Sequence, residues 1–414
     1  MAYEAPIGWR EMSIGDFAKP VSTKNNSSTD IPVLSMTKYD GFVCSEEYFS
    51  KRVYSTNTSK YKVVRKGQFA YATIHLDEGS IDYLRDFDEG LVSPMYTVFE
   101  VNEDIVFRPF LHSLLKRKAL LGHFNTLANG GVNRRKSISF KNLSDAKILI
   151  PPIPEQKKIA EVLSSVDEAI VTTKAVIYQT KQVKKGLLQT LLTKGIGHTK
   201  FKQTELGKVP ESWELKKADD LCITISVGIV IKPAQYYVEA GRGIKAFRSA
   251  NVREGYIEDD KWVYLSKEGH EKNKKSQLKV GDVLVVRSGY TGTSCVVPPE
   301  YNGTNCIDII FARPKQNLVI SEFLSAYINS PEGRKQVLKS EGGLAQKHFN
   351  VTELKKMLVP IPPQAEQIGI IRHLEDAQTA IRLNEAKLNQ LQAIKTGLMS
   401  DLLTGCKRLE ALDA

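Results

Sequence analysis

Apolar residues recur every three or four positions along two stretches of the chain, and this spacing predicts two long amphipathic helices. A helix of ~40 residues is ~60 Å long, so a small domain cannot cover its apolar stripe. We therefore expect the two helices to pair as an antiparallel coiled coil. The apolar positions expected in this contact are Ile159, Val166, Ile170, Val176, Val183, Leu187, Ile370, Leu374, Ile381, Leu388, Leu391 and Leu398.

The two helical stretches are copies of one another. Residues 150–193 and 361–404 align without a gap at an offset of 211, and 17 of the 44 positions are identical. Each copy opens with prolines and a Glu-Gln pair, "IPPIPEQ" and "IPPQAEQ". Proline and an acidic residue both suit the first turn of a helix, so each pair is expected to begin one.

The repeat extends upstream of each helix. "GWREMSIGDF" (8–17) parallels "SWELKKADDL" (212–221), and "RKGQFAYAT" (65–73) parallels "KVGDVLVVR" (279–287). Alternating β-branched and aromatic runs predict strands, and short helices fit residues 110–121 and 320–339.

The predicted fold class is α+β, with two similar mixed α/β globules, two long helices and a pseudo-two-fold internal repeat. The expected segments are a first globule (1–150), a central helix (151–199), a linker with the second globule (200–360) and a C-terminal helix (361–414).

Composition narrows the class of partner. The 414 residues include 58 basic and 47 acidic side chains, a net charge of +11 that favours a polyanion. The five cysteines form no C-x-x-C pair, which is typical of a reducing interior. No apolar run approaches the ~20 residues of a membrane span, and the first residues lack a signal peptide. We expect a cytoplasmic protein without a membrane partner.

The duplicated helix start carries a family resemblance. The doubled "PPxxEQ", the helix end "GLLQTLLTKG" (186–195) and the linker "FKQTELGKVPESWE" (201–214) resemble the specificity subunit of type I restriction–modification systems. The resemblance covers essentially the whole chain. The second copy departs mildly, because Gln364-Ala365 replace Ile153-Pro154 and the linker does not follow it.

This resemblance implies a function and partners. Each globule would be a target-recognition domain that reads one half of a bipartite, asymmetric sequence in double-stranded DNA. The helices would act as a ruler between them and as the dock for two modification (methyltransferase) subunits, through which restriction (endonuclease and translocase) subunits join. The complete complex would act as a DNA adenine methyltransferase and an ATP-dependent endonuclease.

The chain itself lacks the motifs of these reactions. Ile150 and Ile361 stand before the proline pairs where an N-P-P-[FY] methyltransferase loop has asparagine. The sequence has no G-x-x-x-x-G-K-[ST] phosphate loop and no glycine-rich cofactor loop after a strand. The seven histidines are scattered without metal-ligand spacing. We expect no catalytic residue, no cofactor and no metal.

DNA contacts are expected on three pairs of loops, because phosphate contacts position a protein and base contacts specify sequence. "SMTKYDG" (35–41) pairs with "RSANVREG" (248–255), "YATIH" (71–75) with "VRSGYTGTS" (286–294), and the stretches after two paired glycines form the third pair. The candidate residues are Lys38, Tyr39, Thr73, His75, Asn133, Arg134, Arg135, Lys136, Arg248, Asn251, Arg287, Ser288, Tyr290, Thr291, Gln346, Lys347 and His348. A solvated charged loop is the alternative for each position.

Two other classes stay open from the residues alone. One is a coiled-coil scaffold or adaptor whose globules bind protein or carbohydrate, against which the basic charge counts. The other is a self-contained methyltransferase or nuclease, which would need the motifs that are missing.

Overall fold

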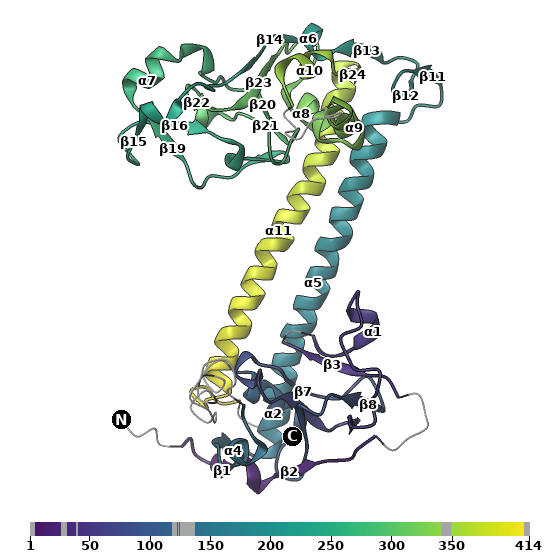
Figure 1. Ribbon diagram of the computed structural model, residues 1–414, viewed down its shortest axis with the longest axis vertical. Coiled ribbons are helices and arrows are strands. Elements are labelled where there is room, and N and C mark those ends of the chain that lie inside the picture. Colours follow the sequence, from purple (N-terminus) through teal and green to yellow (C-terminus); the bar gives the residue numbers. More distant parts are fainter. Residues whose placement is uncertain are drawn as a thin grey trace. The chain divides into compact units, whose positions relative to one another are not determined.

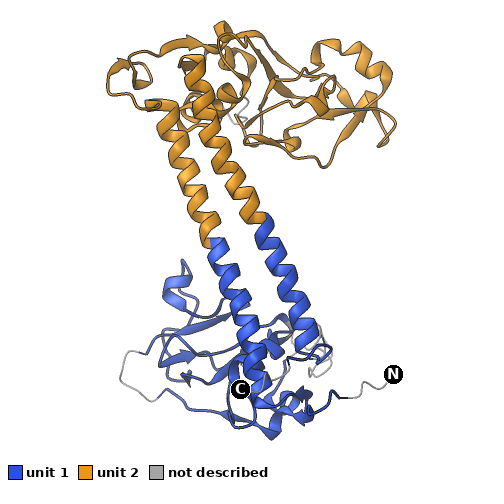
Figure 2. Cartoon of the chain, turned by 180° about the vertical axis from the view of Figure 1, so that it is seen from behind, with its two compact units in different colours: residues 1–174, 386–414 blue, residues 175–385 orange. Residues whose placement is uncertain are grey.

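The structure is a computed structural model that describes residues 5–25, 31–38, 40–117, 122, 124, 137–340 and 349–409. The chain forms two compact units, one of residues 1–174 and 386–414 and the other of residues 175–385 (Figure 2). Among the described helices, none is both long and apolar enough to cross a membrane.

Unit 1 is built on a four-stranded sheet with the order β2-β9-β6-β7. Its two outer strands, β2 and β7, are labelled in Figure 1. Its described elements before the long helix are β1 (Arg10–Ser13), η1 (Ile14–Asp16), β2 (Ala18–Val21), β3 (Leu34–Thr37), β4 (Gly41–Cys44), α1 (Ser45–Tyr48), β5 (Lys62–Arg65), β6 (Phe69–Ala72), η2 (Leu76–Glu78), β7 (Ile81–Tyr83), β8 (Glu89–Val92), β9 (Tyr96–Val101), α2 (Arg108–Lys116), α4 (Phe140–Ser144) and β10 (Lys147–Ile150). The long helix α5 (Ile153–Lys194) follows and continues into unit 2.

Unit 2 repeats this plan around a sheet with the order β14-β23-β20-β21. Its described elements are β11 (Phe201–Thr204), β12 (Gly207–Pro210), β13 (Glu214–Lys217), α6 (Ala218–Leu221), β14 (Cys222–Val227), η4 (Pro233–Tyr236), β15 (Tyr237–Val238), β16 (Ile244–Phe247), η5 (Ser249–Asn251), β17 (Val252–Arg253), β18 (Tyr256–Ile257), β19 (Val263–Leu265), α7 (Lys267–Lys272), η6 (Lys274–Ser276), β20 (Val283–Val286), β21 (Ser294–Val296), η7 (Pro299–Tyr301), β22 (Asn305–Cys306), β23 (Ile309–Pro314), α8 (Ser321–Asn329), α9 (Pro331–Ser340), α10 (Val351–Lys356) and β24 (Leu358–Ile361). The second long helix, α11 (Gln364–Leu402), then runs back into unit 1.

Strand registers confirm the internal repeat. In unit 1 the strand pair β1–β10 aligns Arg10 with Ile150, and in unit 2 the pair β13–β24 aligns Glu214 with Ile361. Each of these pairs ends just before a long helix. The expected class, two similar mixed α/β globules with two long helices, is therefore correct.

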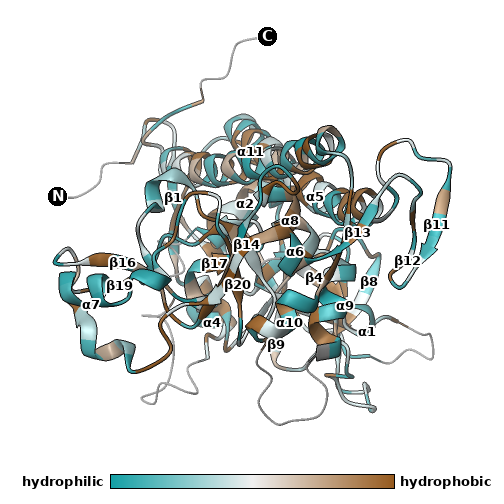
Figure 3. Ribbon diagram, turned by 90° about the horizontal axis from the view of Figure 1, so that it is seen from above, coloured by the Kyte–Doolittle hydropathy of each residue, from teal (hydrophilic) through white to brown (hydrophobic). Residues whose placement is uncertain are grey.

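Both faces of each central sheet are covered. In unit 2 the whole of β20 is buried, and it lies among hydrophobic, brown segments in Figure 3. Val283 and Val285 pack in the cluster of Phe323 and Ile370, on the side of α8 and α11. Leu284 and Val286 pack against the β16 side of the globule. Continuous apolar strands such as "VLVV" are typical of a sheet that is buried on both faces.

The long helices pair antiparallel within each unit. In unit 2, Lys181 Nζ donates to Glu385 Oε1 at 2.7 Å and Lys184 Nζ to Gln378 Oε1 at 2.8 Å, so residue numbers rise on one helix as they fall on the other. In unit 1, Lys395 Nζ lies 2.6 Å from Asp167 Oδ1. Lys184 with Gln378 and Lys395 with Asp167 are equivalent under the offset of 211, so one contact recurs in both units.

Two of the predicted positions are exposed and lie outside the buried contact between the helices. Val176 and Val183 are 38% and 57% exposed, whereas Ile170, Thr173 and Ile177 are buried. The helix contact in this stretch therefore follows positions 170, 173, 177 and 184, and each valine stands one residue before it, about 100° around the helix. The other predicted contact positions are buried or half-buried.

The segment expected as one helix over residues 320–339 is two helices. α8 ends at Asn329 and α9 begins at Pro331. Proline has no N–H to donate to the preceding turn but fits the first position of a new helix, which explains the break.

The glutamine of the first Glu-Gln pair holds the globule to the start of α5. Gln156 is fully buried, and its Oε1 accepts the N–H of Phe107 at 2.7 Å. Its Nε2 donates to the carbonyls of Ile105 and Pro151 at 3.0 and 2.8 Å. One amide thus joins the segment before α2 to the proline turn before α5.

Gln367 makes the same three bonds in unit 2. Its Oε1 accepts the N–H of Ile320 at 3.0 Å, and its Nε2 donates to Leu318 and Pro362 at 2.9 and 3.0 Å. It is also fully buried. The repeated motif therefore encodes a repeated joint between sheet, helix and proline turn.

The glutamates next to these glutamines, Glu155 and Glu366, each bond to a tryptophan and to a residue that follows the end of the other long helix. The Glu155 carboxylate accepts a hydrogen bond from Trp9 Nε1 at 3.2 Å. It also accepts hydrogen bonds from Arg408 Nε and Nη2 at 2.7 and 2.8 Å. Glu366 accepts Trp213 Nε1 at 3.0 Å, and its other oxygen lies 2.8 Å from His198 Nε2. Hydrogen bonds to a charged acceptor are stronger than neutral ones, which suits a buried junction.

We predict that Gln156→Glu and Gln367→Glu each loosen only the unit that contains them. A carboxylate keeps the size of the amide but puts a negative charge against two carbonyl oxygens, at a cost on the order of 3 kcal/mol. Hydrogen–deuterium exchange should rise at residues 105–112 in the first variant and at 318–325 in the second. Gln390→Glu, at an exposed position of α11, is the control. Equal hydrogen–deuterium exchange in all three variants would contradict the prediction that each glutamine stabilises only its own unit.

Candidate nucleic-acid interface

In unit 2 the second predicted loop begins beside Phe349. Arg287 directly follows β20, and its carbonyl accepts the backbone N–H of Phe349 at 3.0 Å. This bond fixes Phe349 next to the start of the loop that begins at Arg287. The Arg287 guanidinium pairs with the carboxylate of Asp308, and its side chain is 21% exposed.

The loop after Arg287 presents a tyrosine. Tyr290 is 77% exposed, and Gly289 and Gly292 on its two sides have φ of +83° and +75°. Glycine adopts this left-handed backbone without the strain that a side chain would add. Ser288 and Thr291 are half-buried. Tyr290 is thus the member of this loop that protrudes most.

A residue that the sequence pattern did not indicate holds this loop. Arg334 of α9 donates from Nη1 to the Thr291 carbonyl at 2.5 Å and from Nη2 to Thr293 Oγ1 at 3.1 Å. A Cβ at Gly292 would lie 2.9 Å from Val337 Cγ2, so the loop packs directly on α9. Burial lowers the pKa of Arg334, in keeping with its position under the loop.

The first predicted loop of unit 2 lies at the same end of the strands. β16 ends at Phe247, whose carbonyl accepts the N–H of Ile307 at 2.8 Å, and the next residue, Asp308, is the partner of Arg287. Arg248 follows Phe247 directly. Its Nη2 donates to the Lys261 carbonyl at 2.9 Å. Arg248 and Arg287 thus begin two loops that are joined through adjacent strand ends.

The Asn251 side chain is bonded to the backbone of its own region. It is fully buried, its Oδ1 accepts the backbone N–H of Arg248 at 3.0 Å, and its Nδ2 donates to Glu258 and Asp260 at 3.2 and 2.7 Å. These bonds use both donors of its amide group, so Asn251 shapes the loop and has no donor left for a base.

Unit 1 places its loops in the same way. The carbonyl of Thr73, which directly follows β6, accepts the N–H of Ile138 at 2.9 Å. This bond is the counterpart of the Arg287–Phe349 bond. The Thr73 hydroxyl donates to the Met95 carbonyl at 3.0 Å, and the exposed His75 lies 3.2 Å from Glu78 through Nδ1.

Lys116 joins the first predicted loop of unit 1 to Gly79, which follows the short helix η2 after the second loop. Lys116 ends α2, and its Nζ donates to the carbonyls of Lys38 and Gly79 at 3.2 and 2.8 Å. Burial lowers the pKa of this ammonium. The sequence did not predict the roles of Lys116 and Arg334, because both donate hydrogen bonds to backbone carbonyls. Every residue has a backbone carbonyl, so no residue pattern reveals such a contact.

The remaining candidates lie outside the described residues. They are Tyr39, Asn133, Arg134, Arg135, Lys136, Gln346, Lys347 and His348. The described residues that follow these stretches, Ile138 and Phe349, are bonded to Thr73 and Arg287 as above.

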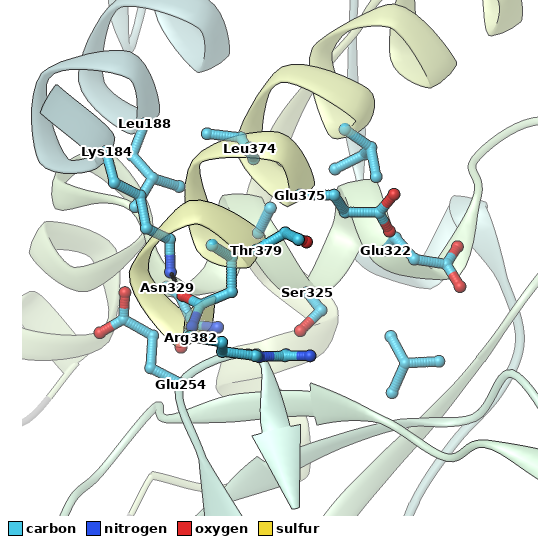
Figure 4. Close-up of a pocket in the computed structure, with 15 residues that line it drawn as sticks. Lys184, Leu188, Glu254, Glu322, Ser325, Asn329, Leu374, Glu375, Thr379 and Arg382 are labelled. Carbon is cyan, nitrogen blue, oxygen red and sulfur yellow. Dashed lines mark hydrogen bonds between the residues drawn. The ribbon is translucent and has the colours of Figure 1, made fainter. Parts of the chain in front are cut away.

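A cavity of about 350 Å³ lies within unit 2 between α8 and the long helices (Figure 4). Ser325 and Asn329 line it from α8, and Lys184 and Leu374 line it from the helices. Phe107 and Ile320 make equivalent bonds to Gln156 and Gln367. At the same distances along the chain from these two residues, α2 has His112 and Lys116 where α8 has Ser325 and Asn329. None of the predicted DNA-contact residues lines this cavity.

Burial shifts the pKa of several titratable side chains among the described residues. Burial raises the pKa of Cys222 and Cys295 to about 12, so these thiols stay protonated. Burial, and after it the charges of Arg85 and Lys116, lowers the pKa of His112 well below its usual value. The described residues include no group of three or more His, Cys, Asp or Glu side chains that could hold a metal ion.

Relatives of the chain share its length. The MjaVIII type I restriction enzyme specificity subunit of Methanocaldococcus jannaschii is 25% identical over 419 residues, covering 99% of this chain and 95% of the relative. The EcoBI type I restriction enzyme specificity subunit of Escherichia coli is 25% identical over 403 residues, covering 90% and 83%.

Solved structures share its fold. A chain from a study of complex assembly and conformational transition of the type I R-M system aligns with a TM-score of 0.61 at 18% identity, covering 97% of this chain and 99% of that one. The HsdS subunit from Thermoanaerobacter tengcongensis aligns with a TM-score of 0.52 at 17% identity, covering 98% of both. A sequence model described as the type I restriction modification DNA specificity domain matches residues 6–181 and 210–393. With most of both halves matched, the chain belongs to the type I restriction–modification DNA specificity family.

Proposed function

We propose that this chain is the DNA-reading subunit of a type I restriction–modification complex and carries out no reaction itself. Each unit reads one half of a bipartite, asymmetric site in duplex DNA. The observation that supports this proposal is one backbone bond that recurs in both units: a residue just after the third predicted stretch, Ile138 or Phe349, donates its N–H to the residue that directly follows a central strand, Thr73 or Arg287. A repeated scaffold with different loops suits two different half-sites.

The residues proposed to contact DNA follow from this arrangement. In unit 2 they are Arg248, Arg287, Ser288, Tyr290 and Thr291, with Gln346, Lys347 and His348 of the adjoining stretch. In unit 1 they are Lys38, Tyr39, Thr73, His75 and residues 133–136. Arginine reads guanine edges, and aromatic and hydroxyl groups contact bases and phosphates, so these residue types support base and backbone contacts.

The long helices are proposed to set the unread gap between the half-sites and to dock two modification subunits, through which restriction subunits join. Support comes from their length, 42 and 39 residues, and from their antiparallel pairing in both units. Methylation of adenine and ATP-dependent cleavage would then belong to the partner subunits.

Exchange of residues 5–150 for the same region of another family member should change one half-site only. The exchange ends at Ile150, where β10 closes against β1. The readout is methylome sequencing of a strain that expresses the chimera with its modification subunit. The reciprocal exchange of residues 212–361 should change the other half-site. A change of both half-sites in either chimera would rule out separate reading.

Arg334→Ala should relax base preference in the half-site of unit 2 and leave the other half-site intact. Loss of the bonds to Thr291 and Thr293 frees the Tyr290 loop, and discrimination should fall by about 1–3 kcal/mol at the affected positions. Arg334→Lys keeps one donor for the Thr291 carbonyl and should restore part of the preference. Lys335→Ala, an exposed neighbour, is the control. A uniform loss of methylation at all sites would mean that Arg334 serves only folding.

Insertion of seven residues after Lys174 and after Glu385 should lengthen the unread gap by about three base pairs. These sites are equivalent under the offset of 211. Seven residues add ~10 Å and preserve the helix contact, and base pairs rise ~3.4 Å each. Insertion in only one helix, which shifts the pairing, is the control. An unchanged gap in the methylome of the double insertion would refute the ruler.

A further inference from the structure

Unit 2 has a basic groove that the predicted DNA loops do not include. It has a volume of about 530 Å³ and lies between the end of η6, the 302–303 turn and the strands β14 and β23. Lys274, Lys275 and Lys279 line one side, and Thr224 and Ser226 of β14 line the other. No Asp or Glu is among its lining residues.

The lysines stand on a fixed backbone. Leu278, inside the lysine segment, donates its N–H to the Thr304 carbonyl at 2.8 Å and accepts the N–H of Gly303 at 2.9 Å. The residue before it, Gln277, donates from Nε2 to His270 Nε2 at 3.0 Å, and His270 Nδ1 lies 2.6 Å from Asn305 Oδ1. The charged segment is therefore held in place by the 303–304 turn and by α7.

The floor of the groove is neutral. Arg313 forms a bidentate pair with Asp282, with both bonds at 2.7 Å, and the Asp282 side chain is fully buried. Lys274 is 3.3 Å from Glu271, but both side chains are more than half exposed, so this pair neutralises little. The positive charge of the groove comes from its lysine side.

We propose that this groove binds the phosphodiester backbone of the duplex that unit 2 reads; the proposal rests on the proposed function. Lysine ammonium groups, the hydroxyls of Thr224 and Ser226, and the amide of Asn302 are donors of the kind that contact phosphate oxygens without reading sequence. The groove anchors the duplex, while the loops at Arg248 and Arg287 select the bases.

The test is the variant Lys274→Gln/Lys275→Gln/Lys279→Gln of the full chain, assembled with its modification subunits. Fluorescence anisotropy with a duplex that carries the target and with a scrambled duplex is measured across a series of KCl concentrations. Each phosphate contact contributes about −0.9 to the slope of log K against log salt. The slope should become less steep by about two to three, affinity for both duplexes should fall by a similar factor, and the methylated sequence should stay the same.

Lys200→Gln/Lys202→Gln/Lys208→Gln, on the β11–β12 hairpin of the same unit, is the matched control with the same loss of charge. It should leave the slope unchanged. Equal slopes in the two triple variants would overturn the groove proposal, because net charge alone would then explain the effect. A groove variant with an unchanged slope that no longer co-purifies with modification subunits would assign the groove to a protein partner and overturn it as well.

Failure of the proposed function is a separate outcome. In that case the unaltered complex would bind target and scrambled duplex equally, or would bind neither. A complex that binds its target selectively, with a salt slope that the groove variant does not alter, would refute the groove alone.

Discussion

The buried amides of Gln156 and Gln367 are the constraint on which the rest of the structure depends. Each is fully buried and uses its oxygen and both N–H groups on backbone atoms of two separate segments. A buried amide that lost one partner would keep its desolvation cost without compensation, so the joint tolerates little displacement. The direction in which a long helix leaves its globule is thereby set at its first turn.

This joint belongs to the part of each unit that is repeated, whereas the loops differ between the two units. The sheet order, the strand pair before the helix, the glutamine bonds and the glutamate–tryptophan bond are the same in both units. The loops after β6 and β20 have different residues, and so do α2 and α8 where they face the helices. Lys116 in one unit and Arg334 in the other hold backbone oxygens of these loops, so the same task is done by different side chains. Loop sequence can therefore change while the frame that presents it stays the same.

How far the sequence predicted this structure differs from element to element. The repeat, the long helices and the doubled motif were predicted because backbone geometry repeats wherever the residues that fix it repeat. Val176 and Val183 were predicted in the helix contact but are exposed. Apolar residues stand at both 176 and 177, and only packing decides which one faces the other helix; after Val183 the contact is made by Lys184, which bonds to Gln378. Asn251 was expected to contact DNA because asparagine often does, yet its amide donors are used within its own loop. Arg334 left no signal, because its partners are a carbonyl and a hydroxyl far along the chain.

The contacts of Glu155 have a consequence for the order in which the protein is made. Trp9 and Arg408 meet on this one carboxylate, and Leu402 and Leu403 pack in the same core as Trp9. Residues 175–385, which form unit 2, are synthesised before Arg408. Unit 1, whose synthesis begins first, is thus completed last. Glu155 and the core around Trp9 lack Arg408, Leu402 and Leu403 until the second globule has been synthesised. Newly made chains therefore pass through a stage with one finished and one open unit, during which the open core is the surface that chaperones and proteases meet.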